Sequence, residues 1–319
     1  MMILKERVRI AFARQQPDRV PLDYLTNPGI DRLLMEHYGL VASDGEGLRQ
    51  ALGIDFRRID APYVGPKLHP DLPRRQVNMW GIHRRWIEHE SGGYWDHCDF
   101  PLREALREKV EAWPLPSPDQ FDYSAVPGQC RRYAQYCCVA GSPGLVDIIN
   151  STGMIRTREQ VLVDLLTDER AGLRYIERKT SIQLEMISRV LEAGKGGIDV
   201  LWIGEDLGTQ RGPLLRLELF RRHLRPCHQR FIDLGKQSGI LVMLHSCGSS
   251  SWAFDDFAAM GVGVVDTLQP EARDLGPAHL KKRYGDRLAF HSCISTVGPR
   301  WQTAPGRRPW RRRARRWRS

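Results

Sequence analysis

The sequence lacks the long hydrophobic runs of membrane proteins. Its longest apolar stretches, such as residues 240–244, are far shorter than the ~20 residues that a transmembrane helix needs. The first 20 residues carry charges throughout, so no secretory signal is expected and the cytoplasm is the expected compartment. The seven cysteines lack the spacing of a disulfide framework and are expected to be free thiols or metal ligands.

Phosphate-binding motifs are also lacking. There is neither a Walker loop nor a GxGxxG pattern, so nothing indicates a nucleotide cofactor. The net charge of +10 suggests nucleic-acid binding, but nine arginines and no acidic residue lie between residues 300 and 319, which leaves +1 for residues 1–299. We therefore expect no nucleic-acid partner for the body of the chain. A basic RNA- or DNA-binding arm is the alternative for the tail.

The basic tail interrupts a folded pattern. Residues 300–319 are a low-complexity segment of Arg, Trp, Pro, Gly and Ala that directly follows a strand-like segment. Read two bases along, codons that encode residues 300–318 can give LANGTREETVEEARAEMEV, an acidic helix opening with a capping box. Our hypothesis is that a frameshift near Pro299 replaced the C-terminus.

Apolar runs alternate with helical patterns over most of the chain. Strands are expected at residues 20–25, 54–60, 136–140, 199–203, 240–244, 262–268 and 288–290. Helices are expected at residues 157–166, 171–193, 217–238, 255–260 and 277–284, with a kink at Pro226. This alternation predicts an α/β fold, a parallel (β/α)8 TIM barrel over residues 1–299. The eighth strand would lie beyond residue 299, and residues 76–102 read as a hairpin insertion.

The motif His245-Ser246-Cys247-Gly248 ends one of the expected strands. Residues i and i+2 of a strand face the same way, so His245 and Cys247 would point together into the barrel mouth as zinc ligands. The triplet recurs at His291-Ser292-Cys293, so Cys293 is a further candidate ligand. The alternative is that both cysteines are buried apolar residues and both histidines cap strand ends.

Acidic residues follow two other strands. Glu205 and Asp206 come after residues 199–203, where the loops of a barrel build its active site, and they are candidates for proton transfer. The alternative is that Asp206 caps the next helix. Asp23, at the end of the first expected strand, is a third catalytic candidate. Tyr24, Gln210 and His291 are candidates for substrate binding.

Several segments together resemble the uroporphyrinogen decarboxylase superfamily. The segments are QQPDRVPLDY, GEDLGTQRGPLL, ELFRRHLRPCHQRFIDLGKQSG, VMLHSCG, DDFAAMGVGVVDTLQPEA and LKKRYGDRLAFHSCIST, and the resemblance covers most of residues 15–299. It implies a single barrel of this type with its active site at one end. The re-read tail also resembles the segment after the seventh strand in this superfamily.

The superfamily contains decarboxylases and corrinoid-linked methyltransferases. The RQAGR signature that binds the decarboxylase substrate has no match between residues 15 and 40. His245 and Cys247 match the first two zinc ligands of the methyltransferases, and Cys293 is the candidate replacement for their later cysteine. The resemblance therefore implies zinc–thiolate methyl transfer with a small-molecule substrate and a corrinoid, or a corrinoid protein, as partner. The alternatives are a cofactor-free tetrapyrrole decarboxylase, and an inactive remnant that binds a ligand.

Overall fold

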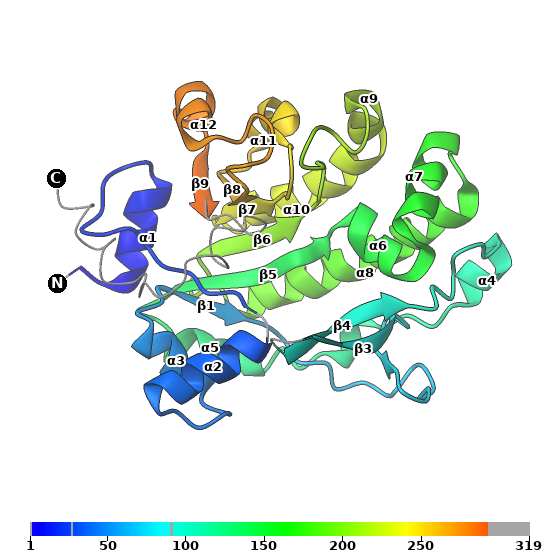
Figure 1. The fold of residues 1–319 in the computed structure, drawn as a ribbon, viewed down its shortest axis with the longest axis horizontal. Helices are drawn as coiled ribbons and strands as arrows, with labels where there is room; N and C mark the ends of the chain where they lie inside the picture. Colours follow the sequence, from blue (N-terminus) through cyan, green and yellow to red (C-terminus); the bar gives the residue numbers. More distant parts are fainter. Residues whose placement is uncertain (1, 27, 90–91, 293–319) are drawn as a thin grey trace.

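The protein is an α/β fold built on a curled parallel sheet (Figure 1). The computed structural model describes residues 2–26, 28–89 and 92–292. Six strands pair in the order β1-β5-β6-β7-β8-β9, and each adjacent pair is parallel. They are β1 (Phe56–Ile59), β5 (Cys137–Val146), β6 (Val200–Gly204), β7 (Leu241–His245), β8 (Val264–Leu268) and β9 (Ala289–Ser292).

Helices follow most of these strands, as parallel crossovers require. The α-helices are α1 (Leu4–Phe12), α2 (Pro28–Tyr38), α3 (Gly45–Ala51), α4 (Arg107–Ala112), α5 (Ala125–Arg132), α6 (Ile148–Arg156), α7 (Arg158–Thr167), α8 (Arg170–Ala193), α9 (Leu217–Leu219), α10 (Arg225–Gln237), α11 (Phe254–Met260) and α12 (Pro277–Tyr284). Short 3-10 turns span Pro118–Gln120 and Ser251–Ala253. The predicted helix over 217–238 is interrupted by a π-helical turn, Phe220–Leu224, just before Pro226.

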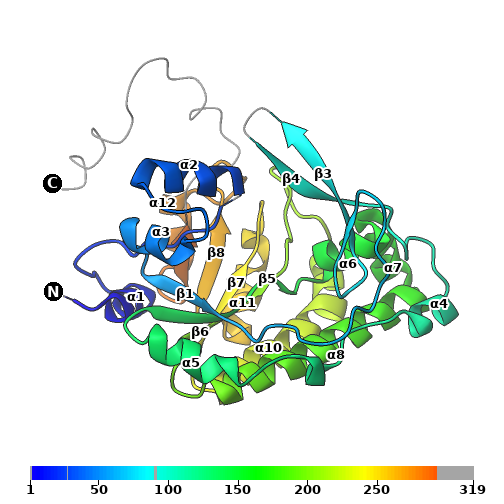
Figure 2. The same cartoon turned by 90° about the horizontal axis from the view of Figure 1, so that it is seen from below.

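The strands divide the apolar core between their two faces. Outward residues such as Leu201, Val242 and Val265 pack against the helices, and Figure 2 shows α8, α10 and α11 along this outer face. Inward residues such as Val200 and Met243 form a second cluster, to which α1 contributes Val8. Alternation along each strand thus buries both faces, which is typical of parallel sheets.

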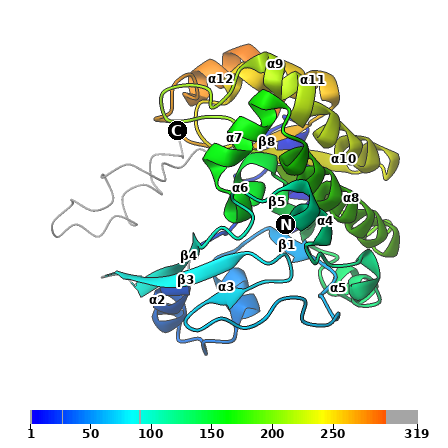
Figure 3. The same ribbon diagram turned by 90° about the vertical axis from the view of Figure 1, so that its right-hand side faces the viewer.

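The segment predicted to be a hairpin insertion forms a separate antiparallel sheet. Its strands are β2 (Gln76–Val77), β3 (His83–His89) and β4 (Gly92–Cys98), in the order β2-β3-β4. Figure 3 shows β3 and β4 beside α2, away from the parallel sheet. This insertion supplies one wall of a cavity near the strand ends.

The eight-stranded barrel is found in part. Among the described residues the parallel sheet has β1 and β9 at its edges, so it is a curled half-barrel and no ring closes there. The strand predicted at residues 20–25 is wrong: that segment is extended but unpaired. Pro21 has no N–H to donate, and the Leu22 N–H donates to the Asp55 side chain. One backbone hydrogen bond remains between this segment and Asp55, from the Asp55 N–H to Leu22 O. The predicted eighth strand and the basic tail lie outside the described residues.

Candidate metal centre

The inner face of the sheet turns polar toward the carboxyl ends of its strands. Each of four strands carries an apolar inward residue followed two positions later by a polar one. These pairs are Phe56 and Arg58 on β1, Met243 and His245 on β7, Val264 and Asp266 on β8, and Ala289 and His291 on β9. An apolar layer with α1 beneath it therefore supports a polar layer at the mouth of the half-barrel.

Asp266 joins the two histidines of this layer. Its Oδ2 lies 2.8 Å from His245 Nδ1, and its Oδ1 lies 2.6 Å from His291 Nδ1. Burial opposes the charge on Asp266, but these two bonds outweigh it and hold the pKa of the carboxyl well below its usual range. Burial also opposes charge on His245, yet its bonds to Asp266 and Cys247 raise the pKa of the imidazole to about 10. The site therefore stabilises positive charge on His245.

Three possible metal ligands converge at the end of β7: Asp206, His245 and Cys247, together called the metal cluster. One atom each from Asp206, His245 and Cys247 lie within 4.8 Å of one another. His245 Nε2 is 3.4 Å from Cys247 Sγ and 3.6 Å from Asp206 Oδ1. Asp206 is itself held by the Cys247 N–H at 2.8 Å and by the Asn150 amide at 2.6 Å.

The spacing of these atoms fits zinc. Zinc–nitrogen and zinc–sulfur bonds are about 2.0 and 2.3 Å long, so at a tetrahedral angle the two donors on one ion lie about 3.5 Å apart. The 3.4 Å between His245 Nε2 and Cys247 Sγ matches this value. Asp266 takes the Nδ1 side of the ring and leaves Nε2 for the metal, which is the usual carboxylate–histidine–zinc arrangement.

Glu205 points away from this cluster, although it precedes Asp206 in sequence. Its side chain is 1% exposed and accepts the N–H groups of Ile148 and Ile149 at the start of α6. Burial raises the pKa of Glu205 well above its usual value. Glu205 therefore anchors α6 behind the sheet, and of the two predicted carboxylates only Asp206 reaches the metal cluster.

The other predicted residues lie around the centre. Asp23 accepts a hydrogen bond of 2.6 Å from Arg58 and lies 3.5 Å from His291 Nε2, so both side chains belong to the polar layer. Tyr24 donates to Asp31 and packs against the inner apolar cluster. Gln210 donates to Gln269, which in turn accepts the Gly248 N–H and so ties the loop after β6 to the loop after β7. Cys293 lies outside the described residues.

A cavity of about 720 Å³ opens onto the cluster. Its walls are formed by residues of β4 and the loop after it, of the turn in β5, and of α6 and α7. Asp206 and His245 complete the lining. Among the residues that line it are Asp147, Asn150, Asp206 and His245. This volume is in the usual range for small-molecule sites.

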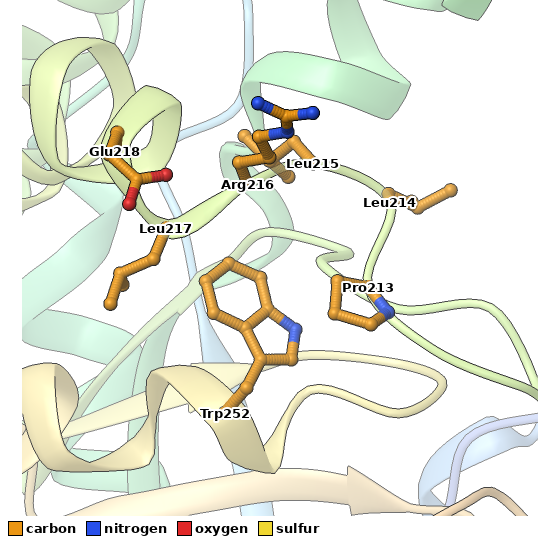
Figure 4. Close-up of a pocket in the computed structure, with 7 residues that line it drawn as sticks. All are labelled: Pro213, Leu214, Leu215, Arg216, Leu217, Glu218 and Trp252. Carbon is orange, nitrogen blue, oxygen red and sulfur yellow. The ribbon is translucent and has the colours of Figure 1, made fainter.

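A second hollow of about 530 Å³ lies outside this region. It is formed by residues 213–218 and Trp252, and the indole lies between Pro213 and Leu217 (Figure 4). None of the predicted site residues lines it.

Sequence reasoning missed Asp266, Asn150 and Asp147. Asp266 carried a usable signal, because it alternates with the apolar Val264 on the strand between the two His-Ser-Cys triplets. Asn150 and Asp147 carried none, since both belong to the beginning of a helix that was not predicted.

No model of a protein family matches this chain, and no curated protein matches it in sequence. Among solved structures, a methyltransferase from Methanosarcina mazei has a similar fold, with a TM-score of 0.62 at 16% sequence identity. The likeness covers 93% of this chain and 84% of that one. This chain therefore shares the fold of that protein. No helix within the described residues is long and apolar enough to cross a membrane.

Proposed function

We propose that this protein is a zinc-dependent methyltransferase that methylates a small thiol, with a corrinoid as the methyl donor. The observation that carries the proposal is the convergence of Asp206, His245 and Cys247 beside a cavity of small-molecule size, which Asp206 and His245 line. The fold shared with a methyltransferase supports it, as does the resemblance of the His-Ser-Cys motif to the zinc ligands of corrinoid-linked enzymes.

The residues of the centre have distinct tasks in this proposal. His245, Cys247 and Asp206 would hold zinc, which supplies Lewis acidity that lowers the pKa of a substrate thiol. Asp266 fixes the orientation of the His245 ring. Asn150 fixes the Asp206 carboxylate. The thiol enters the cavity, and the methyl donor, free or carried by a corrinoid protein, approaches from the cavity mouth.

Metal analysis of purified protein tests the proposal. We expect about one zinc per chain, lost in Cys247→Ser because the thiolate is a principal ligand. Cys227→Ser is the matched control, since Cys227 is not in the cluster and burial raises the pKa of its thiol to about 11. The zinc-loaded protein should also demethylate methylcobalamin in the presence of 2-mercaptoethanol.

Two outcomes would contradict the proposal. One is wild-type protein that binds no zinc, and the other is zinc that persists in Cys247→Ser. Metal-independent decarboxylation of a tetrapyrrole would instead support the alternative decarboxylase.

A further inference from the structure

A buried carboxylate in the wall of the cavity has no role in metal binding. Asp147 caps α6, and its Oδ1 accepts the Asn150 N–H at 3.1 Å. Within the described part of the chain, Oδ2 has no hydrogen bond. Asp147 is only 5% exposed, yet it lines the cavity. A carboxylate oxygen that is enclosed by protein but open to a cavity is available to a bound molecule.

Asp147 lies beside the metal cluster without belonging to it. Asn150 stands between the two, because its backbone N–H reaches Asp147 and its side-chain amide reaches Asp206. The first turn of α6 therefore places a second carboxylate in the wall of the cavity that Asp206 lines.

A buried lysine balances the charge behind this wall. Lys179 on α8 is 3% exposed, and its ammonium donates to Ser151 Oγ, which donates to the Asp147 carbonyl. Burial lowers the pKa of Lys179 to about 8, while the charges of Asp147 and Glu205 oppose that change. Lys179 does not line the cavity, so it acts on Asp147 through the electrostatic field of its ammonium group.

We infer that Asp147 is the proton acceptor that activates the substrate thiol, and that Lys179 tunes it. The inference rests on the proposed function. The S–H bond of the thiol breaks, its proton forms an O–H bond with Asp147 Oδ2, and the electron pair stays on sulfur for attack on the methyl group. No oxidant or reductant is needed, because the step is a proton transfer alone.

The surroundings of Asp147 suit it to this step. The charged groups that act on it are Lys179 on α8, Glu205 and Asp206 after β6, and His245 on β7. The other charged or titratable residues of the same cavity wall are Asp96, His97, Arg103, Arg158 and Glu159. Burial is the largest influence and raises the pKa of Asp147 to about 6, with Lys179 opposing it and Asp206 adding to it. A base with a pKa near the working pH accepts a proton more effectively than an ordinary aspartate does.

The number of protons released on thiol binding tests the inference. Zinc-loaded protein is titrated calorimetrically with 2-mercaptoethanol in buffers of different ionisation enthalpy, at a pH close to the pKa of Asp147. Wild-type protein should release about half a proton per thiol, because Asp147 is half-protonated at that pH and takes up the rest. Asp147→Asn, in which the thiol stays un-ionised, should release none. Asparagine caps helices as well as aspartate does, so α6 should persist. Asp44→Asn, which changes the equivalent cap of α3, is the control and should match wild type.

Rates give a second readout. Asp147→Asn should slow methyl transfer at neutral pH by about 10²-fold or more, and the rate should recover at higher pH, where the bound thiol ionises unaided. Lys179→Met should move the rising limb of the pH profile to higher pH, because loss of the cation raises the pKa of Asp147 further. A merely structural role would lower the rate equally at every pH.

The failures of the two proposals are distinguishable. Equal proton release by wild type and Asp147→Asn, with zinc and thiol both bound, overturns the role of Asp147 and leaves the methyltransferase intact. Absence of zinc or thiol binding by wild type overturns the proposed function. Carboxyl NMR of zinc-free protein measures the pKa of Asp147 without requiring zinc or thiol binding. An ordinary aspartate pKa for Asp147 would also overturn the inference.

Discussion

Two acidic regions lie on opposite sides of the carboxyl end of β6. Behind the sheet, Glu205 is enclosed and bonds to two backbone amides of α6, with Lys179 and His228 nearby. In front, Asp206 is partly exposed and meets His245 and Cys247 at the cavity. Adjacent residues thus have different tasks: the enclosed carboxylate stabilises the wall, and the open one is free to bind a ligand.

The largest effect should come from the enclosed side. Glu205→Ala leaves two buried amides without an acceptor. We expect a loss of about 3–5 kcal/mol in the free energy of unfolding, measured by urea denaturation. Asp206→Ala is the matched comparison and should cost about 1 kcal/mol or less while abolishing zinc binding. Equal destabilisation by the two changes would refute the division between the regions.

Local signals explain what was predictable. Apolar runs that end in polar residues located β1 and β6 to β9 to within about two residues, and the start of β5. The end of β5 was missed, since the strand continues past the predicted residue 140 to Val146. Thr157, the first residue of the helix predicted over 157–166, caps α7, since its side chain accepts the Gln160 N–H. The pairing of His245 with Cys247 agrees with the alternation of side chains along a strand.

Features that depend on contacts distant in sequence were not predictable. Residues 20–25 have the composition of a strand, but Asp55 takes their N–H group in place of a neighbouring strand. Glu205 and Asp206 appear equivalent in sequence, and only the position of α6 separates them. Asp266 acquires its importance from strand order, which places it between His245 and His291.

An intermediate effect should come from the residue that orients the metal ligand. Asp266→Asn weakens the hold on His245 Nδ1 and should reduce zinc affinity by about 10- to 100-fold. Competition with a chromophoric chelator measures this change. Asp23→Asn is the control, because Asp23 contacts Arg58 and His291 but none of the three ligands. Similar losses in both variants would mean that the whole polar layer, rather than Asp266, determines affinity.

The smallest effect should come from the support of Asp206. Asn150→Ala removes one hydrogen bond to its carboxylate, and one such bond is worth about 0.5–1.5 kcal/mol, so zinc affinity should fall by roughly 2- to 10-fold in the same competition assay. Gln229→Ala breaks a side-chain hydrogen bond to Asp233 on α10, away from the ligands, and should leave affinity unchanged. If Asn150→Ala had no effect, Asp206 would be positioned by the Cys247 N–H alone, and the open region would need no support from α6.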